Sequence, residues 1–282
     1  FHPTVTFESH NFPTGKSPFG GAETGTGGRQ RDNKMTGRGA YLIAGTIVYC
    51  VGNLYIPGYP LPWEDPTLPY PADSASGLQI LIDGSNGASD YGNKSGEPVV
   101  AGSVRSFDLK IIDDERWAWL KPTLGTGGIG EIPDYNVKKD DPVVGMKIVS
   151  IGGRAYRIGF GGGAASSMHQ GENKAELDFN AVQRGDAEIA RKEYCVIRAC
   201  IELGTRNPIA LAHDQGAGGK FNNLMELVEK SGGRVNILKI NVGDPTLSEL
   251  EIMVCEFQEC DGLLIYDDRF DEFAAICERE GV

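Results

Sequence analysis

Three separated acidic residues and one histidine are the side chains best suited to chemistry on a phosphorylated ligand. Glu8 and His10 stand in the stretch ESHN (8–11), at the end of an apparent strand, and Asp32 and Asp214 follow later. A histidine in that position can transfer a proton, and carboxylates are ligands that Mg²⁺ prefers. The alternative for His10 is a hydrogen-bonded histidine with a purely structural role. Together the three acids predict a site for a magnesium nucleotide.

The segment between the first two acids is dense in glycine. GAETGTGGRQRD (21–32) offers consecutive backbone N–H groups that could hold phosphates, with Arg29 and Arg31 as charged partners and Asp32 as a cation ligand. A plain glycine turn without a ligand is the alternative. GFGGGAASS (159–167) likewise predicts either a second anion site or a close-packed turn.

Two nucleotide motifs are matched only in part. TGKS (14–17) contains Gly-Lys-Ser, but the P-loop needs an earlier glycine where this sequence has His10. TGTGG (24–28) is not a G-x-G-x-x-G fingerprint, and no buried strand followed by a helix flanks it. Neither stretch therefore predicts a P-loop or a dinucleotide-binding fold.

Length and composition exclude several other classes of protein. The 282 residues are enough for one large domain or two ordinary ones, and the net charge of −12 argues against a nucleic-acid partner. Six cysteines without a C-x-x-C pair favour reduced thiols in a cytoplasmic protein over a zinc site. No apolar run reaches about 18 residues, so no membrane partner is expected. The sequence starts at Phe1 without Met and stops after an apparent helix, so we expect a piece of a longer protein.

The elements that must position these residues change in character along the chain. The first half is rich in strands, and a polar, proline-bounded linker is expected at 131–145. In the second half, Asp186 is expected to cap a helix that ends at Gly204, and further helices carry Leu224 and Phe273. A hairpin is expected at 108–122 and an irregular proline-rich loop at 56–73. Strands or buried segments are expected at 39–51, 77–83, 98–104, 146–153, 155–160, 207–212, 234–240 and 262–266.

Five stretches, in order, resemble a known family. They are ESHNFPTGKSPFGGAETGTGGRQRD (8–32), GRAYRIGFGGGAASS (153–167), ELDFNAVQRGD (176–186), NPIALAHDQGAGG (207–219) and GDPTLSELEIMVCEFQE (243–259). The family that they resemble is phosphoribosylformylglycinamidine synthase, an amidotransferase of purine biosynthesis. HNFP and the proline-rich loop are similar to its large, single-chain form.

The resemblance implies an α/β (α+β) module like aminoimidazole ribonucleotide synthetase. Residues 1–140 would form a β-rich, ferredoxin-like, ATP-binding domain whose start is missing, and 141–282 an α/β sandwich whose end is missing. Two such halves pair through their N-terminal sheets in this family. The second half and the glutaminase domain, with its cysteine nucleophile, would lie outside this sequence.

The resemblance also implies a reaction. ATP phosphorylates the amide oxygen of formylglycinamide ribonucleotide (FGAR) to an iminophosphate, and ammonia released from glutamine displaces the phosphate. ATP and Mg²⁺ are the implied cofactors. The alternative is a non-catalytic half that holds a nucleotide, or a degenerate pseudoenzyme. We expect this piece alone to be inactive, and its self-association as a homodimer stays open.

Site residues are carried over by motif. His10 is similar to the catalytic acid/base of the family, and the metal ligands would be Glu8, Asp32 and Asp214. The implied ATP contacts are Gly21, Ala22, Glu23, Thr24, Gly25, Thr26, Gly27, Gly28, Arg29, Gln30, Arg31 and Asp32, with Ala101, Gly102 and Ser103 as a second contact. The implied substrate contacts are Asn11, Phe12, Pro13, Thr14, Arg31, Gln183, Glu256, Phe257 and Gln258.

Overall fold

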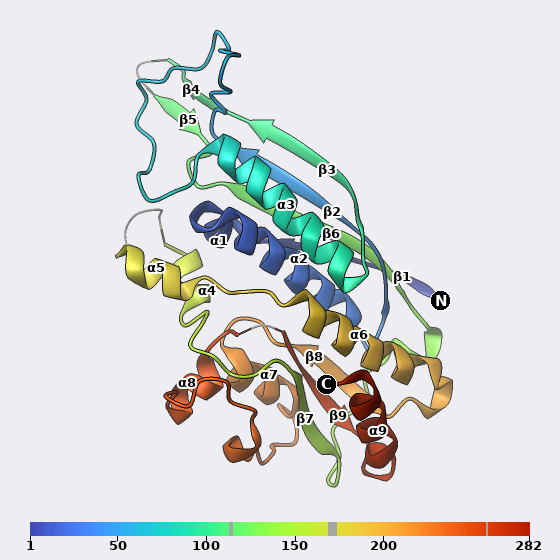
Figure 1. Cartoon of the computed structure of the whole chain (residues 1–282). Coiled ribbons are helices and arrows are strands. Elements are labelled where there is room, and N and C mark those ends of the chain that lie inside the picture. The colour runs from blue at the N-terminus through green and yellow to red at the C-terminus, as the bar shows by residue number, and fades with distance from the viewer. Residues whose placement is uncertain (113–114, 169–173, 258) are drawn as a thin grey trace.

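Two sheet-based units lie one above the other in the computed structural model, which describes residues 1–112, 115–168, 174–257 and 259–282 (Figure 1). The N-terminal sheet has the order β1-β6-β2-β3, and its pairs are antiparallel except for the parallel pair of β2 with β3. Its strands are β1 (His2–Ser9), β2 (Tyr41–Val51), β3 (Val99–Ser106) and β6 (Thr123–Ile132). A small hairpin of β4 (Asp108–Lys110) and β5 (Arg116–Ala118) projects beyond it.

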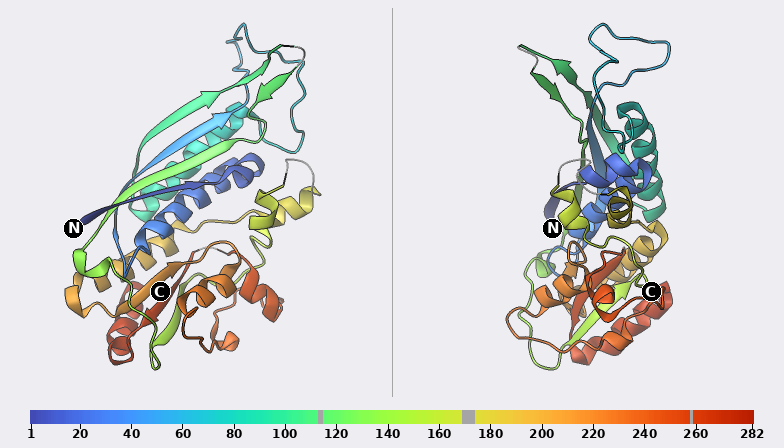
Figure 2. Two further views of the ribbon diagram at one scale, coloured as in Figure 1. Left: turned by 180° about the vertical axis from the view of Figure 1, so that it is seen from behind. Right: turned by 90° about the vertical axis from the view of Figure 1, so that its left-hand side faces the viewer.

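Helices cover one face of this sheet. They are α1 (Asn11–Lys16), α2 (Pro18–Lys34) and α3 (Gly77–Ser95). Ala22 of α2 and Ile80 of α3 pack on Ile47 and Leu124 of the sheet to form the core of this unit. Figure 2 shows the strands from the side away from these helices. Apolar side chains of that face are exposed, such as Val5 and its cross-strand partner Ile129.

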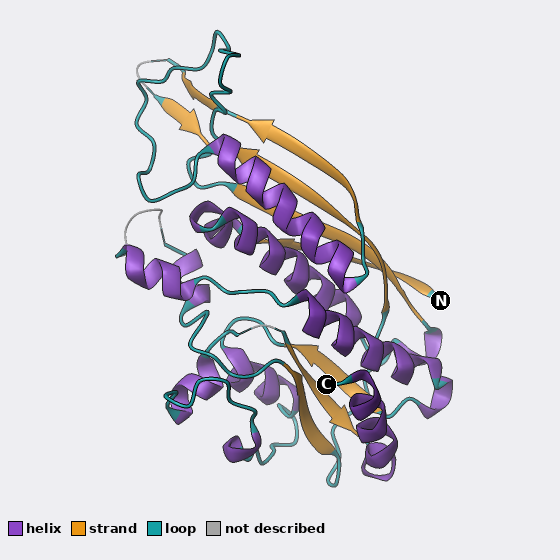
Figure 3. Cartoon of the chain, viewed as in Figure 1, coloured by secondary structure: helices purple, strands orange, loops and turns teal. Residues whose placement is uncertain are grey.

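The C-terminal unit is a sheet between helices. Its antiparallel strands have the order β7-β9-β8, with β7 (Lys147–Gly152), β8 (Ile209–Asp214) and β9 (Cys260–Ile265). Helices α6 (Ala187–Glu202) and α9 (Phe270–Glu280) pack on one face and α7 (Gly219–Leu227) on the other. Figure 3 shows the shorter helices around them, α4 (Gly162–Ser166), α5 (Ala175–Ala181) and α8 (Glu249–Val254). Short 3₁₀ turns lie at Asp134–Asn136, Gly204–Arg206, Ile237–Lys239 and Asp267–Arg269. Among the described helices, none is long and apolar enough to cross a membrane.

Most of the expected elements are confirmed. Strands form within 39–51, 98–104, 146–153 and 262–266, and β8 covers the end of 207–212. Asp186 caps α6, because its side chain accepts hydrogen bonds from the backbone N–H groups of Glu188 and Ile189 at 3.1 Å. The hairpin at 108–122 is present, although residues 113–114 of its turn lie outside the described part of the chain.

Three expected strands are wrong. Residues 77–83 begin helix α3, whose first turn is capped by Ser76 and whose end is fixed by Gly96 in the left-handed region. Residues 155–160 form only an isolated bridge, at Ala155, and 234–240 form a 3₁₀ turn instead of a strand. Arg157 of the first of these two segments bonds to Glu251 of α8.

Candidate functional site

Helix α2 carries the glycine-rich segment. Its five glycines disfavour an isolated helix by about 5 kcal/mol in total, at about 1 kcal/mol each relative to alanine. Pro18 begins the helix, where its missing N–H costs no helical hydrogen bond. Tertiary packing must supply the rest of the stability, and α2 lies on the sheet beside α3, where Gly87 touches the backbone of Phe19.

The glycines of α2 admit neighbouring parts of the protein. A Cβ on Gly21 would lie 2.5 Å from the backbone of α1, and one on Gly25 would lie 2.9 Å from the Cβ of His10. A Cβ on Gly28 would overlap the carboxylate of Glu8. Because these three glycines share one face of the helix, that face brings α1, His10 and Glu8 together.

The expectation of a phosphate-holding loop at 21–32 is therefore wrong. The N–H of Gly21 donates to the Ser17 carbonyl at 2.7 Å, and the following N–H groups lie within the hydrogen-bonded helix. The hydroxyls of Thr24 and Thr26 donate to helix carbonyls four residues earlier. Any ATP contact from this segment would have to come from side chains, because its backbone donors are already used.

His10 occupies the junction between β1 and α1. It is 9% exposed, and its Nδ1 lies 2.6 Å from the carbonyl oxygen of Gly21. A carbonyl can only accept, so Nδ1 carries the hydrogen and the lone pair of the neutral ring lies on Nε2. Burial lowers the pKa of His10, against the opposing hydrogen bonds to Gly21 and Gln183, and so favours the neutral ring.

Gln183 links His10 to Glu256. The His10 Nε2 lies 3.3 Å from Gln183 Oε1, and the Gln183 amide donates to Glu256 Oε2 at 2.6 Å. Glu256 also accepts from the backbone N–H of Gly218 at 3.2 Å, and burial raises its pKa. The glycine N–H group after β8 thus binds a carboxylate of the protein itself.

The three predicted metal ligands influence one another electrostatically. Burial raises the pKa of Glu8 to about 8, with Arg31 opposing the shift and Asp32 and Asp214 adding to it. Partial removal from water and the neighbouring Asp214 carboxylate raise the pKa of Asp32 to about 7. Asp214 ends β8, so it lies at the carboxyl end of that strand.

Within the described ranges, no three His, Cys, Asp or Glu side chains are close enough to hold a metal ion together. Mg²⁺ does not require such a cage, since one or two carboxylates and substrate phosphates usually hold it. Asp32 and Asp214 supply two hard oxygen ligands, and the buried Glu8 Oε2 has no hydrogen-bond partner among the described residues. These side chains fit a hydrated magnesium ion brought in with a nucleotide.

Buried ion pairs fix the basic residues of α2. Both terminal nitrogens of Arg29 bind the Glu97 carboxylate, at 2.6 and 2.5 Å, and both side chains are almost fully buried. Arg31 Nη1 binds Glu259 Oε2 at 2.5 Å. These carboxylate partners were not predicted as site residues, although Glu259 ends the polar stretch CEFQE (255–259).

A third pair joins the two units of the chain. Lys34 of α2 binds Glu193 of α6 at 3.0 Å and Asp261 of β9 at 2.6 Å. All three side chains are at most 2% exposed, so the ion pairs are shielded from solvent and fix α2 against the C-terminal sheet. Burial raises the pKa of Glu193 well above its usual range, and Asp261 adds to the shift.

Several predicted substrate contacts are packing residues in this structure. Phe12 and Phe257 belong to apolar clusters, and the buried Thr14 hydroxyl donates to the His10 carbonyl at 2.7 Å. Pro13 is buried in α1. Asn11 is half-buried and accepts from the Leu124 N–H through Oδ1 at 2.9 Å, and Gln258 lies outside the described residues.

The second predicted ATP contact lies apart from His10. Ala101, Gly102 and Ser103 are exposed residues of β3, at the edge of the sheet. Two strands separate β3 from β1, which at about 4.8 Å per strand places these residues about 14 Å from Glu8. Within the described chain they do not join the site around α2.

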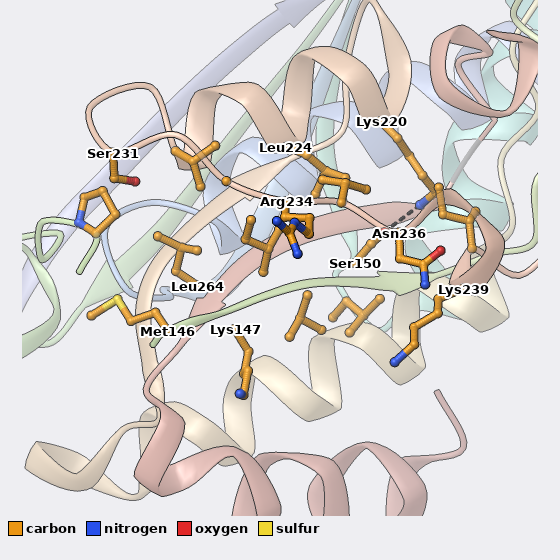
Figure 4. A pocket seen from close by; sticks show the side chains of 18 of the residues that line it. Met146, Lys147, Ser150, Lys220, Leu224, Ser231, Arg234, Asn236, Lys239 and Leu264 are labelled. Atoms are coloured by element: carbon orange, nitrogen blue, oxygen red, sulfur yellow. Dashed lines mark hydrogen bonds between the residues drawn. The ribbon is translucent and has the colours of Figure 1, made fainter. Parts of the chain in front are cut away.

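A cavity of about 880 Å³ lies in the C-terminal unit (Figure 4). It runs along the free edge of β7 and contains the bond of Lys220 Nζ to Ser150 Oγ at 2.6 Å. Its charged lining residues, Lys147, Lys220, Arg234 and Lys239, are all basic. None of the predicted site residues lines it, so cavity size does not indicate the site here.

Comparison with known proteins agrees with this architecture. Residues 143–282 match the family model described as AIR synthase related protein, C-terminal domain, and this part of the chain belongs to that family. Nearly the whole chain is related to phosphoribosylformylglycinamidine synthase. It is 54% identical over 275 residues to the Arabidopsis thaliana protein named probable phosphoribosylformylglycinamidine synthase, chloroplastic/mitochondrial, covering 98% of this chain and 20% of that relative. The resemblance predicted from the motifs is confirmed.

Solved structures share the fold. PurL from Thermotoga maritima complexed with FGAR has a TM-score of 0.73 at 24% identity, and the match covers 99% of this chain and 40% of that one. PurL complexed with ATP has a TM-score of 0.69 at 21% identity, covering 99% and 38%. The expected α+β architecture is thereby confirmed. The chain spans about one fifth of the length of the curated relatives that it matches.

Proposed function

We propose that this chain is the ATP-dependent synthetase part of a protein that converts FGAR to formylglycinamidine ribonucleotide in purine biosynthesis. The observation that carries the proposal is that His10, Gln183 and Glu256 lie side by side, with His10 Nε2 3.3 Å from Gln183 Oε1 and the Gln183 amide donating to Glu256, next to the acidic residues Glu8 and Asp32. His10 and Glu8 contact α2 at Gly25 and Gly28, which are one helical turn apart. The names of the relatives and the FGAR and ATP complexes of PurL support the same assignment.

The chemistry requires activation of an amide oxygen, which is a poor leaving group. ATP supplies a phosphoryl group to that oxygen, and ammonia derived from glutamine then displaces the phosphate. Mg²⁺, when bound, offsets the charge of the phosphates. Neutral His10 presents its Nε2 lone pair beside Gln183 and can take up or return the proton of the attacking ammonia or of the amide. The bond from Nδ1–H to the Gly21 carbonyl fixes the imidazole ring, and Glu256 fixes the neighbouring Gln183 side chain.

The remaining site assignments are part of the same proposal. We assign Asp32, Asp214 and Glu8 to the cation, and the side chains of α2 to ATP. Arg31 is turned toward Glu259 and is buried, so any contact that it makes with a phosphate or with FGAR needs a change of rotamer. A domain limit near residue 140 is supported by the irregular chain between β6 and β7 and by the family match that begins at 143.

Further parts are proposed to complete the enzyme. The free face of the N-terminal sheet is the surface on which a second synthetase half, or a second copy of the chain, would pair, and a glutaminase domain would supply ammonia. Residues Ala101 to Ser103 on β3 would then contact ATP held by the opposite half. This chain alone is expected to show no synthetase activity. A cytoplasmic location is supported by its six free cysteines, although the Arabidopsis relative is named chloroplastic/mitochondrial.

The test is His10→Asn in a polypeptide of the relatives' full length that carries this sequence. Formation of product from FGAR, ATP and ammonium ions should fall by about 100-fold or more, since general acid–base catalysis contributes about 10²–10⁴. Mg–ATP affinity, measured by calorimetry, should stay within about threefold. Unchanged product formation would refute the assignment of His10. Tight ATP binding without any turnover by the unaltered polypeptide would instead favour the non-catalytic nucleotide-holding module.

A further inference from the structure

Arg31 lies near two sets of carboxylates and is bound to only one of them. Its Nη1 binds Glu259 at 2.5 Å, in a pair whose side chains are 5% and 0% exposed. Asp214, and Glu8, which lies against Gly28 one helical turn before Arg31, also favour its positive charge. These carboxylates therefore compete for a single guanidinium group.

Two buried polar atoms of these residues have no hydrogen-bond partner in the described part of the chain. They are Glu8 Oε2 and Arg31 Nε. Arg31 is nevertheless the charged group with the largest effect on the pKa of Glu8. A carboxylate and a guanidinium that approach each other in a buried site usually form a two-bond pair. They do not do so here because Glu259 holds the guanidinium.

Glu259 is itself firmly placed. The residue is fully buried, the backbone N–H of Asp186 donates to its Oε1 at 3.5 Å, and the hydroxyl of Tyr91 lies beside it next to Gly27. Gly27 leaves the space in α2 that this arrangement needs, because a Cβ there would lie 2.6 Å from the Tyr91 hydroxyl. Glu259 is therefore anchored on the C-terminal unit independently of Arg31.

We propose that Glu259 is a positioning residue that holds Arg31 away from Glu8 and Asp214, and so keeps these carboxylates free to bind a divalent cation. The inference rests on the proposed function, because that function requires a cation beside ATP. Without the charge of Glu259, the guanidinium turns toward the nearest uncompensated carboxylates. A carboxylate paired with arginine is a weaker metal ligand because the cation must first displace the guanidinium.

The experiment measures Mn²⁺ binding to the whole chain in the presence of ATP, from the electron paramagnetic resonance signal of the free ion. Glu259→Gln keeps the size of the side chain and removes its charge, and it should weaken Mn²⁺ binding by about 10-fold or more. The matched control is Glu97→Gln, which removes an equally buried partner from Arg29 in the same helix. This control should change Mn²⁺ affinity by less than about twofold. If Glu259 contributed only to fold stability, both variants would lose Mn²⁺ affinity to a similar degree.

A second substitution tests the cause of the loss. Adding Arg31→Met to Glu259→Gln removes the competing guanidinium and should return Mn²⁺ affinity to within about threefold of the unaltered chain. If Glu259→Gln does not fold, Glu259→Asp is measured in its place. Aspartate keeps the negative charge, so Mn²⁺ affinity should stay within about threefold of that of the unaltered chain. A loss as large as 10-fold in Glu259→Asp would then overturn the inference.

The outcomes separate this inference from the function on which it rests. If Mn²⁺ binding weakens in Asp32→Asn but not in Glu259→Gln, the proposed role of Glu259 is wrong and the cation site remains supported. Equal losses in Glu259→Gln and Glu97→Gln, or no recovery on adding Arg31→Met, also overturn it. An unaltered chain that binds no Mn²⁺ with ATP overturns both proposals.

Discussion

Gly21 of α2 lies against the backbone of Thr14 in α1, so closely that a Cβ on Gly21 would be 2.5 Å from the Thr14 nitrogen. The neighbouring carbonyl of Pro13 is equally close, and neither group can turn aside as a flexible side chain could. The glycine-rich segment therefore serves close packing between helices. Its role in the site is to let α1, His10 and Glu8 approach α2.

Gly21→Ala should destabilise the chain by about 1–3 kcal/mol, the usual cost of overpacking, despite alanine's better helix propensity. Gly20→Ala is the matched control in the same helix. Its Cβ would meet only the Ser17 hydroxyl, at 3.5 Å, so this change should stabilise the chain by up to about 1 kcal/mol. Urea unfolding followed by circular dichroism measures both free energies. A neutral or stabilising Gly21→Ala would contradict the packing role.

The conformation of the glycine-rich segments could not be predicted from local patterns. In GTGGIG (125–130), four glycines suggest a turn, yet these residues form the inner strand β6. A Cβ on Gly128 would overlap the guanidinium of Arg29, so glycine makes room there for a buried ion pair from α2. Such contacts join residues about 100 positions apart, and no local window contains them.

Elements whose signals are local were predictable. Asp186 followed by a periodic apolar face predicts α6, and the apolar run before Asp214 predicts a strand that ends at a carboxylate. The site residues also differ in whether the sequence alone could identify them. His10 and Gln183 were singled out by motif and are brought together, whereas Glu259 is recognisable only from its contact with Arg31.

Glu8→Gln should make stability less dependent on pH. The folded-state pKa of Glu8 is about 8 against an ordinary value of 4.5, so the folded chain holds a proton that the unfolded chain releases between these values. Stability from this group is therefore present below about pH 4.5 and is lost as the pH rises toward 8. Glutamine cannot ionise, so the variant should match the unaltered chain near pH 5 and exceed its free energy of unfolding by roughly 2–4 kcal/mol at pH 8.

Thermal unfolding at several pH values, with a chelator present to exclude divalent cations, measures this difference. Glu188→Gln provides the control, because Glu188 is exposed and pairs only with Lys192 on the surface of α6. That change should leave the pH profile unaltered. A constant difference between Glu8→Gln and the unaltered chain from pH 5 to pH 8 would show that Glu8 ionises normally in the folded state.

The free face of the N-terminal sheet predicts self-association. Val5, Phe7 and Ile129 are 77%, 68% and 50% exposed on the side of the sheet that the helices leave open. Exposed apolar patches of this kind usually mark an interaction surface, and a symmetric pair of copies can bury the same patch twice. We therefore expect the chain to form dimers at micromolar concentrations when no other partner is present.

Val5→Asp combined with Ile129→Asp should convert these dimers to monomers, because each copy would then bury two unpaired charges in the interface. Val144→Asp is the control, since Val144 is fully exposed in the C-terminal unit and is remote from the sheet. Sedimentation velocity between about 5 and 100 μM measures the association. Monomers of the unaltered chain across this range, or dimers that survive both aspartates, would exclude this face as the contact between copies.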